Sequence, residues 1–258
     1  MTGPALTLPL GRFAWHDLMT TDLDRSRSYY ADLLGWTYED SEIPGVGAYP
    51  MIWAAGRSWG GMVQPKREAP PHWLSHVIVE DADAASVRAE ALGGRTLFPP
   101  SDIPGAGRFA VIASPGGAPV SAWRPSNPED DGDVPMVPGV FCWHQLLASQ
   151  PEVEAPFFAE LFGWQAMSHE VGGLPYTLFQ RKDTGKPAGG MLPKPPGSGG
   201  PSSWLVYVAV ENADDTAARV RELGGSVWVE PSDIPGMGRF LVTSDPEGAM
   251  IAFIQPAG

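Results

Sequence analysis

The 258-residue chain has a single cysteine, Cys142, and few basic residues. One cysteine cannot form an intramolecular disulfide, so we expect a reducing compartment, the cytosol. The 17 lysines and arginines are outnumbered by 30 aspartates and glutamates, which gives a net charge of −13. Proteins that bind nucleic acid or anionic membranes neutralise phosphates with clustered basic residues. The sequence contains no such cluster, and we expect neither partner.

Long apolar runs are also missing. A membrane-spanning helix needs about 18 to 20 consecutive apolar residues, and the sequence has no run of that length. Residues 1–6 show no basic region ahead of an apolar stretch, so we expect no secretory signal. With 43% hydrophobic residues, the chain can nevertheless bury a core.

The most informative feature that is present is an internal repeat. The segment Pro-Ser-Asp-Ile-Pro-Gly-Ala-Gly-Arg-Phe at 100–109 returns at 231–240 with one change, and Trp15-His16 returns as Trp143-His144. Repetition over such long offsets predicts a duplicated structural unit. The prolines and acids between the halves are typical of a linker. We predict two tandem domains and the linker that joins them, at 9–125, 138–257 and 126–137.

Each half divides again into two similar modules. The first module has a strand-like run at 12–19, helix N-cap candidates at Thr20-Thr21-Asp22, an apolar helical stripe and Gly35 as the C-cap. Short strand-like pieces follow at 48–54 and 60–65. The second module repeats this order, with a strand at 73–79, a helix at 82–92 and strands at 95–98, 108–113 and 118–123. The sequence therefore predicts an α+β fold of four βαβββ modules.

Two motifs resemble the vicinal-oxygen-chelate family of glyoxalases, bleomycin resistance proteins and extradiol dioxygenases. The series Asp22-Leu23, Ser28-Tyr29-Tyr30 and Leu33-Leu34-Gly35-Trp36 is similar to the opening strand and helix of that family. Asp245-Pro246-Glu247-Gly248 resembles its D-P-x-G turn before the last strand. The tandem form is similar to a glyoxalase-like subgroup. The resemblance implies curved mixed sheets, in which each pair of modules forms one cup.

The resemblance also implies where metal-using members hold a divalent ion. The matching positions here are Trp15 and Trp143 in the opening strands, Leu74 and Leu205 in the fifth, and Ser121 and Ala252 in the last. A further position falls in 60–63 and 189–192, which contain no carboxylate or imidazole. Indole and aliphatic side chains have no lone pair to give to a cation. If the ligand position were shifted by one residue to His16 or His144, strand alternation would place that side chain on the opposite face of the sheet. We expect no metal and no other cofactor.

Strand alternation predicts the side chains that line the two cups. In the first cup these are Phe13, Trp15, Asp17, Met19, Leu74, His76, Ile78, Ser121 and Trp123. In the second cup they are Phe141, Trp143, Gln145, Leu205, Tyr207, Ala252 and Ile254. Trp73 and Trp204 join the candidate ligand-binding residues, although these tryptophans either line a ligand space or fill it. Trp36 and Trp164 follow a helix-ending glycine and are expected to be structural.

Two further sets of polar residues have alternative interpretations. Asp17 and His76 are candidate catalytic residues, an acid and a base in an apolar surround, or they satisfy each other as buried polar groups. Arg108 and its counterpart Arg239 follow the repeated Pro-Gly-x-Gly segment. Each arginine either braces that loop by pairing with Asp102 or Asp233, or meets an anionic group of a ligand.

The main functional hypothesis is metal-independent binding of a hydrophobic, partly aromatic small molecule, as in sequestration or resistance proteins. The alternative is an enzyme, a lyase, isomerase, hydroxylase or glyoxalase-like protein, that acts on a small carbonyl or polyketide-type compound through Asp17 and His76. The missing ligands argue against a metal-dependent glyoxalase or dioxygenase. Four modules in one chain are compatible with a monomer or a homodimer.

Overall fold

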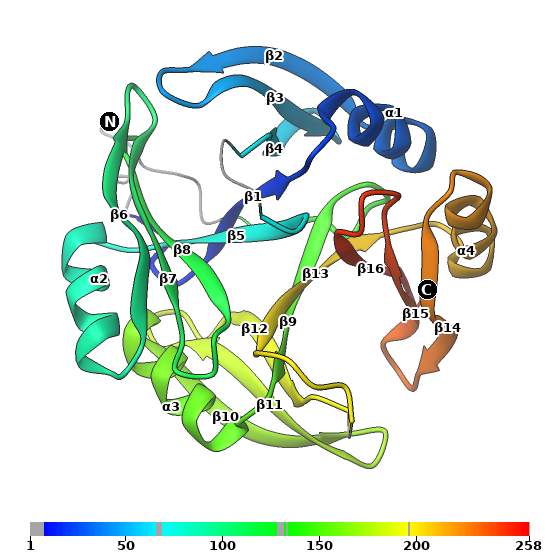
Figure 1. The fold of residues 1–258 in the computed structure, drawn as a ribbon. Coiled ribbons are helices and arrows are strands. Elements are labelled where there is room, and N and C mark those ends of the chain that lie inside the picture. Colours follow the sequence, from blue (N-terminus) through cyan, green and yellow to red (C-terminus); the bar gives the residue numbers. More distant parts are fainter. Residues whose placement is uncertain (1–7, 66–68, 128–131, 133, 196, 258) are drawn as a thin grey trace, which may run out of the picture. The chain divides into compact units, whose positions relative to one another are not determined.

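The computed structural model describes residues 8–257 apart from 66–68, 128–131, 133 and 196. The first residues, which bear on the secretory signal, and part of the predicted linker lie outside the described residues. The described chain forms four helices and sixteen strands, arranged as four successive βαβββ modules (Figure 1). None of these helices has the length and apolar character that crossing a bilayer requires.

The four modules have closely similar elements. The first contains β1 (Phe13–Met19), α1 (Leu23–Leu34), β2 (Thr37–Ile43), β3 (Gly47–Ala54) and β4 (Arg57–Val63). The second contains β5 (His72–Ile78), α2 (Ala82–Ala91), β6 (Arg95–Ile103), β7 (Gly107–Ala113) and β8 (Pro119–Pro125). The third contains β9 (Phe141–Ala148), α3 (Pro151–Phe162), β10 (Trp164–Val171), β11 (Leu174–Arg181) and β12 (Pro187–Pro193). The fourth contains β13 (Ser203–Ala209), α4 (Ala213–Glu222), β14 (Ser226–Ile234), β15 (Gly238–Ser244) and β16 (Met250–Pro256).

The strands form two eight-stranded mixed sheets. Hydrogen bonding gives the orders β2-β3-β4-β1-β5-β8-β7-β6 and β10-β11-β12-β9-β13-β16-β15-β14. In every module the first strand pairs in parallel with the last, and the hairpins within the modules are antiparallel. The predicted α+β fold of four βαβββ modules is confirmed.

Local sequence explains where the first helix begins and ends. The Asp22 side chain accepts a hydrogen bond from the Arg25 backbone N–H at 3.0 Å, which satisfies a donor that the helix start leaves unpaired. Gly35 ends the helix with φ of 69°, a left-handed conformation that glycine adopts at low cost. Gly163 ends α3 in the same way, with φ of 68°. Of the three N-cap candidates at residues 20–22, Asp22 is therefore the cap of α1, and the predicted C-cap Gly35 is confirmed.

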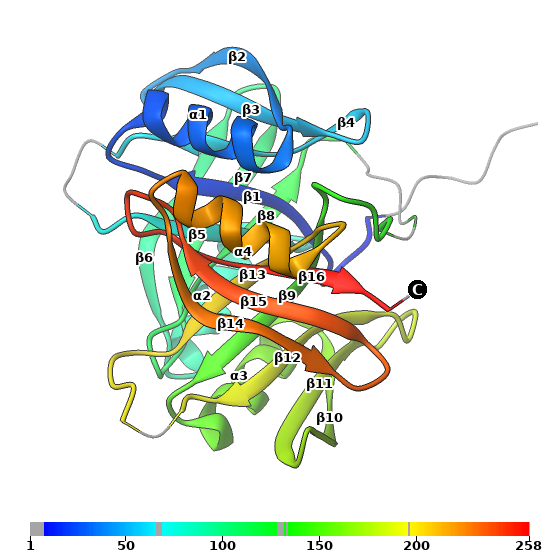
Figure 2. The same cartoon turned by 90° about the vertical axis from the view of Figure 1, so that its right-hand side faces the viewer.

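The chain forms two compact units, and each combines segments from both halves of the sequence. Unit 1 comprises the chain up to Ala14, Ser75–Asp133 and His144–Trp204. Unit 2 comprises Trp15–Leu74, Val134–Trp143 and Leu205–Gly258. Within unit 2, α1 and α4 lie side by side (Figures 1 and 2). The predicted boundaries at 9–125 and 138–257 follow the duplicated sequence and stay a prediction.

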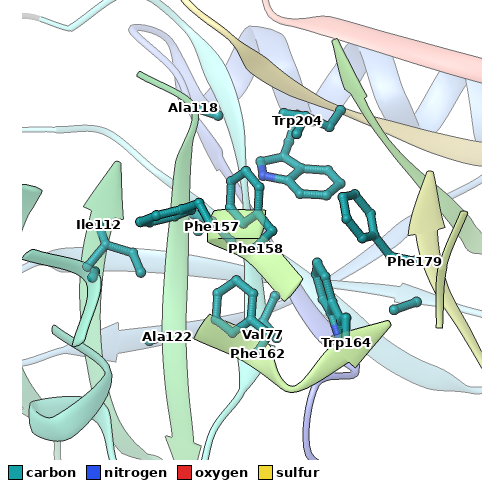
Figure 3. Close-up of a cluster of buried hydrophobic side chains, with 14 of the residues drawn as sticks. Val77, Ile112, Ala118, Ala122, Phe157, Phe158, Phe162, Trp164, Phe179 and Trp204 are labelled. Carbon is teal, nitrogen blue, oxygen red and sulfur yellow. The ribbon is translucent and has the colours of Figure 1, made fainter. Parts of the chain in front are cut away.

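An aromatic cluster fills the core of unit 1 (Figure 3). Phe158 of α3 packs edge-on against Trp204, with ring centroids 5.1 Å apart. Phe13 reaches the same cluster and stacks on His144 at 3.7 Å. The Trp164 indole N–H donates to the carbonyl of Gly11 at 2.8 Å, so this buried ring has its polar atom satisfied.

Unit 2 repeats this arrangement with the partners exchanged. Phe141 stacks on His16 at 4.0 Å, and Trp36 donates to the carbonyl of Gly139 at 2.7 Å. Trp36 also packs edge-on against Trp73 at 6.0 Å. The expected structural role of Trp36 and its counterpart in unit 1 is confirmed, because both are almost fully buried in these cores.

The orientation expected for Phe13 and Phe141 is wrong. Both rings lie in the cores beside the helices instead of facing a cup. Phe13 and His16 lie three residues apart, on opposite faces of β1 as the period of two predicts, and they belong to the cores of different units. The expectation fails because the face that Phe13 shares with Trp15 is covered by the core of unit 1 at this end of the strand.

Among the described residues, each unit contains one buried carboxylate. In unit 1, Glu154 accepts a hydrogen bond from the Ser114 hydroxyl at 2.9 Å, and burial raises the pKa of Glu154. In unit 2, Asp245 accepts from the Tyr30 hydroxyl at 3.1 Å, and burial raises its pKa as well. Ser114 and Asp245 occupy the same turn in the two repeats, so the carboxylate lies on the helix in one unit and on the turn in the other.

Candidate ligand-binding site

The first candidate surface is the face of β5, β7 and β8 that lies opposite the helix-side core of unit 1. Val77 and Ala122 belong to that core, so strand alternation places their neighbours on the other face. We call this surface the His76 wall, and it comprises His76, Phe109, Val111, Ser121 and Trp123. The strand register pairs His76 with Ser121 and Phe109 with Trp123, which brings the predicted residues of β5 and β8 together.

The His76 wall is aromatic with a polar centre. His76 packs edge-on against Trp123 at 6.3 Å and lies 6.5 Å from the Phe109 ring. Phe98 of β6, almost half exposed, stacks on Phe109 at 5.4 Å. The Ser121 hydroxyl is fully buried and has no hydrogen-bond partner among the described residues. Leaving a buried hydroxyl unpaired is costly, so this oxygen is a candidate contact for a polar ligand atom.

The equivalent surface in unit 2 is more apolar. We call it the Tyr207 wall, and it comprises Trp143, Leu205, Tyr207, Phe240, Val242, Ala252 and Ile254. Trp143, Phe240 and Ile254 remain partly exposed. Five residues predicted for the second cup therefore share one cluster. Gln145 lies in unit 1, is buried, and donates to the carbonyl of Leu146 at 3.2 Å.

The third candidate surface is a hydrogen-bonded group in unit 2, the Asp17 cluster, formed by Trp15, Asp17 and Tyr49. The Tyr49 hydroxyl donates to Asp17 Oδ1 at 2.5 Å, and the Trp15 indole N–H lies 3.1 Å from the same oxygen and 2.6 Å from the Tyr49 oxygen. His16 and Leu18 face the helix-side core, so Trp15 and Asp17 face the opposite side. Both are partly exposed.

Sequence reasoning missed Tyr49. Its ring lies against Gly61, where any Cβ would overlap it. The second half repeats this contact between Tyr176 and Gly190. Paired glycines inside a strand often mark a close approach by another group, so Gly60-Gly61 and Gly189-Gly190 carried the signal.

The two repeated arginines form braces. Arg108 contacts Asp83 on α2 at 2.5 Å and Asp102 across the β6–β7 hairpin at 2.9 Å. Arg239 contacts Asp214 at 2.9 Å and Asp233 at 2.9 Å in the same geometry. Each guanidinium already meets two carboxylates, which favours the bracing role; ligand contact by Arg108 or Arg239 stays a prediction.

The remaining predicted residues are mostly buried. Trp73 and Trp204 are at most 8% exposed and lie in the cores of unit 2 and unit 1. Leu74 is 4% exposed. Asp17 and His76 belong to different compact units, and their predicted catalytic roles stay a prediction.

Comparison with known proteins identifies the family of the chain. Residues 15–122 match a family model described as a glyoxalase-like domain, and residues 144–253 match the Glyoxalase/Bleomycin resistance protein/Dioxygenase superfamily. The protein "Putative glyoxylase CFP32" of Mycobacterium tuberculosis is 35% identical over 249 residues, which cover 94% of each chain. The chain belongs to the glyoxalase/bleomycin resistance protein/dioxygenase superfamily.

Other superfamily members extend the comparison. The anthracycline biosynthesis protein DnrV of Streptomyces peucetius is 30% identical over 260 residues, covering 95% of this chain and 93% of that protein. The Mn(II)-bound glyoxalase of Novosphingobium aromaticivorans has a TM-score of 0.64 at 17% identity, with 95% of this chain and 82% of that chain covered. The 2,3-dioxygenase LapB of Pseudomonas sp. KL28 has a TM-score of 0.66 at 13% identity, with 98% and 94% covered. At such low identities the solved structures show the superfamily fold alone.

The side chains at the superfamily's metal positions do not fit a divalent ion. The sequence resemblance assigns these positions in the first sheet to Trp15, Leu74 and Ser121, of which only the serine offers an oxygen. In the part of the chain that the structure describes, no three histidine, cysteine, aspartate or glutamate residues gather as a metal site would need. Metal sites in proteins are built from such donors.

Proposed function

We propose that this protein binds a planar aromatic small molecule, without a metal ion, on the sheet faces opposite its helices. The observation that carries the proposal is the His76 wall, where Trp123, Phe109 and the exposed Phe98 present aromatic surface. They surround the buried Ser121 hydroxyl, which has no hydrogen-bond partner in the described part of the chain. Ligand sites combine apolar and aromatic walls with a few polar groups that fix orientation. The Tyr207 wall offers a second aromatic surface of the same kind.

Similar proteins support an aromatic ligand. DnrV is named for anthracycline biosynthesis, and anthracyclines contain fused planar rings. A planar polycyclic compound matches the offset and edge-on packing that aromatic side chains prefer. Sequestration of such a compound, or resistance to it, is the role that we propose.

Tryptophan fluorescence tests this proposal. We expect 2-naphthylmethanol, a neutral aromatic probe, to quench the protein's fluorescence saturably, and calorimetry to give the same affinity. Trp123→Leu and Trp143→Leu each remove one aromatic contact and should weaken binding by about three- to tenfold. Trp228→Leu is the matched control, because Trp228 is 66% exposed on the edge strand β14.

The controls separate specific binding from surface adsorption. Equal weakening by all three substitutions would indicate nonspecific adsorption. Absence of saturable binding by this probe and by larger planar compounds such as anthraquinone would contradict the proposal.

Acid–base catalysis on a small carbonyl compound is the second candidate. The hydrogen bonds that orient Asp17 favour it, because a catalytic carboxylate must be held in place. We expect Asp17→Asn and His76→Asn to abolish turnover of a ketoaldehyde such as methylglyoxal while leaving urea unfolding nearly unchanged. Turnover that survives both substitutions would exclude this assignment.

A further inference from the structure

Ser121 is a polar side chain at the centre of the His76 wall, which is otherwise mostly aromatic and apolar. The strand register places it beside His76 on β5 and Val111 on β7, and all three residues belong to unit 1. Ser121 is 0% exposed, and its hydroxyl has no hydrogen-bond partner within the described ranges of the chain. A buried hydroxyl without a partner destabilises a folded protein, so a group of this kind requires an explanation.

A second buried serine shows that burial alone does not indicate a ligand. Ser75 is 2% exposed, and its hydroxyl also finds no partner among the residues that the structure describes. Ser75 precedes His76 on β5, so strand alternation points it away from the wall and toward the helix-side core. Ser121 lies instead on the face that carries Phe109 and Trp123, and both of these rings are partly exposed. The combination of a buried hydroxyl and accessible rings is what distinguishes Ser121.

The second half of the chain has the same kind of surface without the polar centre. Phe240 stands at the position of Phe109, but Ala252 stands at the position of Ser121. Ala252 is 0% exposed as well, so the sheet buries this position in both copies and does not need a hydroxyl there. The hydroxyl is therefore a feature of the His76 wall and not a requirement of the fold.

The charge of the surroundings favours a neutral ligand oxygen over an anionic one. The five residues of the His76 wall include neither lysine nor arginine, and the net charge of −13 repels anions. A carboxylate or phenolate on this surface would lose its water without a basic side chain to replace it, which is costly. A ketone or quinone oxygen has no charge and needs only a donor. The serine hydroxyl supplies that donor, because its hydrogen rotates toward whichever acceptor is present.

We infer that the Ser121 hydroxyl donates a hydrogen bond to a neutral carbonyl oxygen of the aromatic ligand. This contact makes the His76 wall favour aryl ketones and quinones over hydrocarbons with the same rings. The inference rests on the proposed function, because it names one group of the ligand proposed there. Phe109 and Trp123 pack against the ligand rings while the oxygen reaches the hydroxyl. Rotation of the partly exposed Trp123 side chain admits the oxygen, and exposed side chains change rotamer rapidly.

Three flat probes that share one ring system test the inference. Fluorenone has only an acceptor, fluorenol has a donor and an acceptor, and fluorene has neither. We expect the wild-type protein to bind fluorenone more tightly than fluorene, and fluorenol no more tightly than fluorenone. Tryptophan fluorescence titration and equilibrium dialysis measure the three affinities.

Substitutions assign the preference to one hydroxyl. Ser121→Ala should lower the ratio of fluorenone to fluorene affinity about three- to tenfold and leave fluorene binding nearly unchanged. Ser75→Ala is the matched control, because it removes a buried hydroxyl of the neighbouring strand on the other face of the sheet, and it should leave this ratio unchanged. Trp123→Leu should weaken the binding of all three probes alike, since the ring contact is common to them.

The outcomes distinguish this inference from the proposed function. If none of the probes binds, the proposed function fails and the inference fails with it. If fluorene binds as tightly as fluorenone, aromatic binding stands and the role of Ser121 is wrong.

Three further results would overturn the inference while leaving aromatic binding intact. These are a fluorenone preference that survives Ser121→Ala, an equal loss of that preference in Ser75→Ala, and tighter binding of fluorenol than of fluorenone. Should Ser121→Ala fail to fold, Ser121→Cys decides, because a thiol is a weak donor of similar size and should lower the same ratio.

Discussion

Phe13 stacks face to face on His144, with ring centroids 3.7 Å apart and ring planes 8° apart. Phe141 stacks on His16 in the same manner, at 4.0 Å and 5°. The two pairs correspond by the sequence repeat, with their partners exchanged between the halves. A phenylalanine from one half of the chain therefore completes a core that contains the histidine of the other half.

Removing one of these rings should destabilise the protein strongly. Phe13→Ala leaves a cavity among His144, Trp164 and Trp204, and we expect a loss of about 3–5 kcal/mol in the free energy of unfolding, measured with urea. Val87→Ala is the control, because Val87 is 70% exposed on α2 and should change stability by less than about 0.5 kcal/mol. Equal losses in the two variants would contradict the core role of Phe13.

The buried Glu154 predicts a pH dependence of stability. Burial raises its pKa above the usual value of 4.5, against hydrogen bonds from Ser202 and Ser114 that lower it. The folded state thus binds the proton more tightly than the unfolded state, so this contribution to stability is fully present below about pH 4.5 and is lost as pH rises through the folded pKa.

Glu154→Gln removes this dependence without changing the size of the side chain. The difference in unfolding free energy, wild type minus variant, should decrease from pH 4 to pH 7 in a series of urea titrations. A difference that is constant or that increases with pH would show that the folded pKa is not raised.

The lone thiol should be unreactive in the folded protein. Burial raises the pKa of Cys142 to about 12, and its sulfur lies 3.6 Å from the carbonyl of Tyr207. Because the thiolate is the reactive form, alkylation by iodoacetamide at pH 8 should be roughly a thousandfold slower than in urea-unfolded protein. Mass spectrometry over time measures both rates, and similar rates would contradict the burial of this side chain.

Gly61→Ala tests the contact that holds Tyr49. The added methyl group overlaps the phenol ring, and overpacking of this kind costs about 1–3 kcal/mol in the free energy of unfolding. Gly190→Ala should cost a similar amount, because a methyl group there would overlap the ring of Tyr176 in the same way. A wild-type melting temperature in Gly61→Ala would show that Tyr49 is not confined there.

Arg108→Gln distinguishes the bracing role of this arginine from contact with an anionic group of a ligand. The variant loses two exposed ion pairs, and we expect only a small decrease in melting temperature, which high salt should diminish. Arg239→Gln should behave alike. Binding of the anionic probe 2-naphthoate should be unchanged in both variants, and a large loss of its affinity would favour direct contact between the arginine and the ligand.

The fold was predictable from the sequence because the repeat, the cap of α1 at Asp22 and its end at Gly35 all indicate the same module. Facing residues on β5 and β8 followed from alternation, which placed His76 and Trp123 together. The exchange of Phe13 and Phe141 was not predictable, because it depends on contacts between segments about 130 residues apart. Local periodicity contains no information about such distant partners.

The candidate site was predictable only in part, because its contacts also join residues that are far apart in the sequence. Asp17 stood out as an acid in an apolar strand, whereas its partner Tyr49 looked like an ordinary strand residue. Only the glycine pair at 60–61 hinted at a ring packed against the backbone. The unpaired Ser121 hydroxyl required knowledge of its neighbours in space.

The exchange of carboxylates between Glu154 and Asp245 restricts how this duplicated gene can change. Copying the fourth module over the second would place an aspartate at position 114, directly opposite Glu154. Two carboxylates would then be buried next to each other. The reverse copy would leave Tyr30 facing a serine in place of its acceptor. The residue at this turn in each module therefore fits only its own unit. Gene conversion between the modules would destabilise the protein.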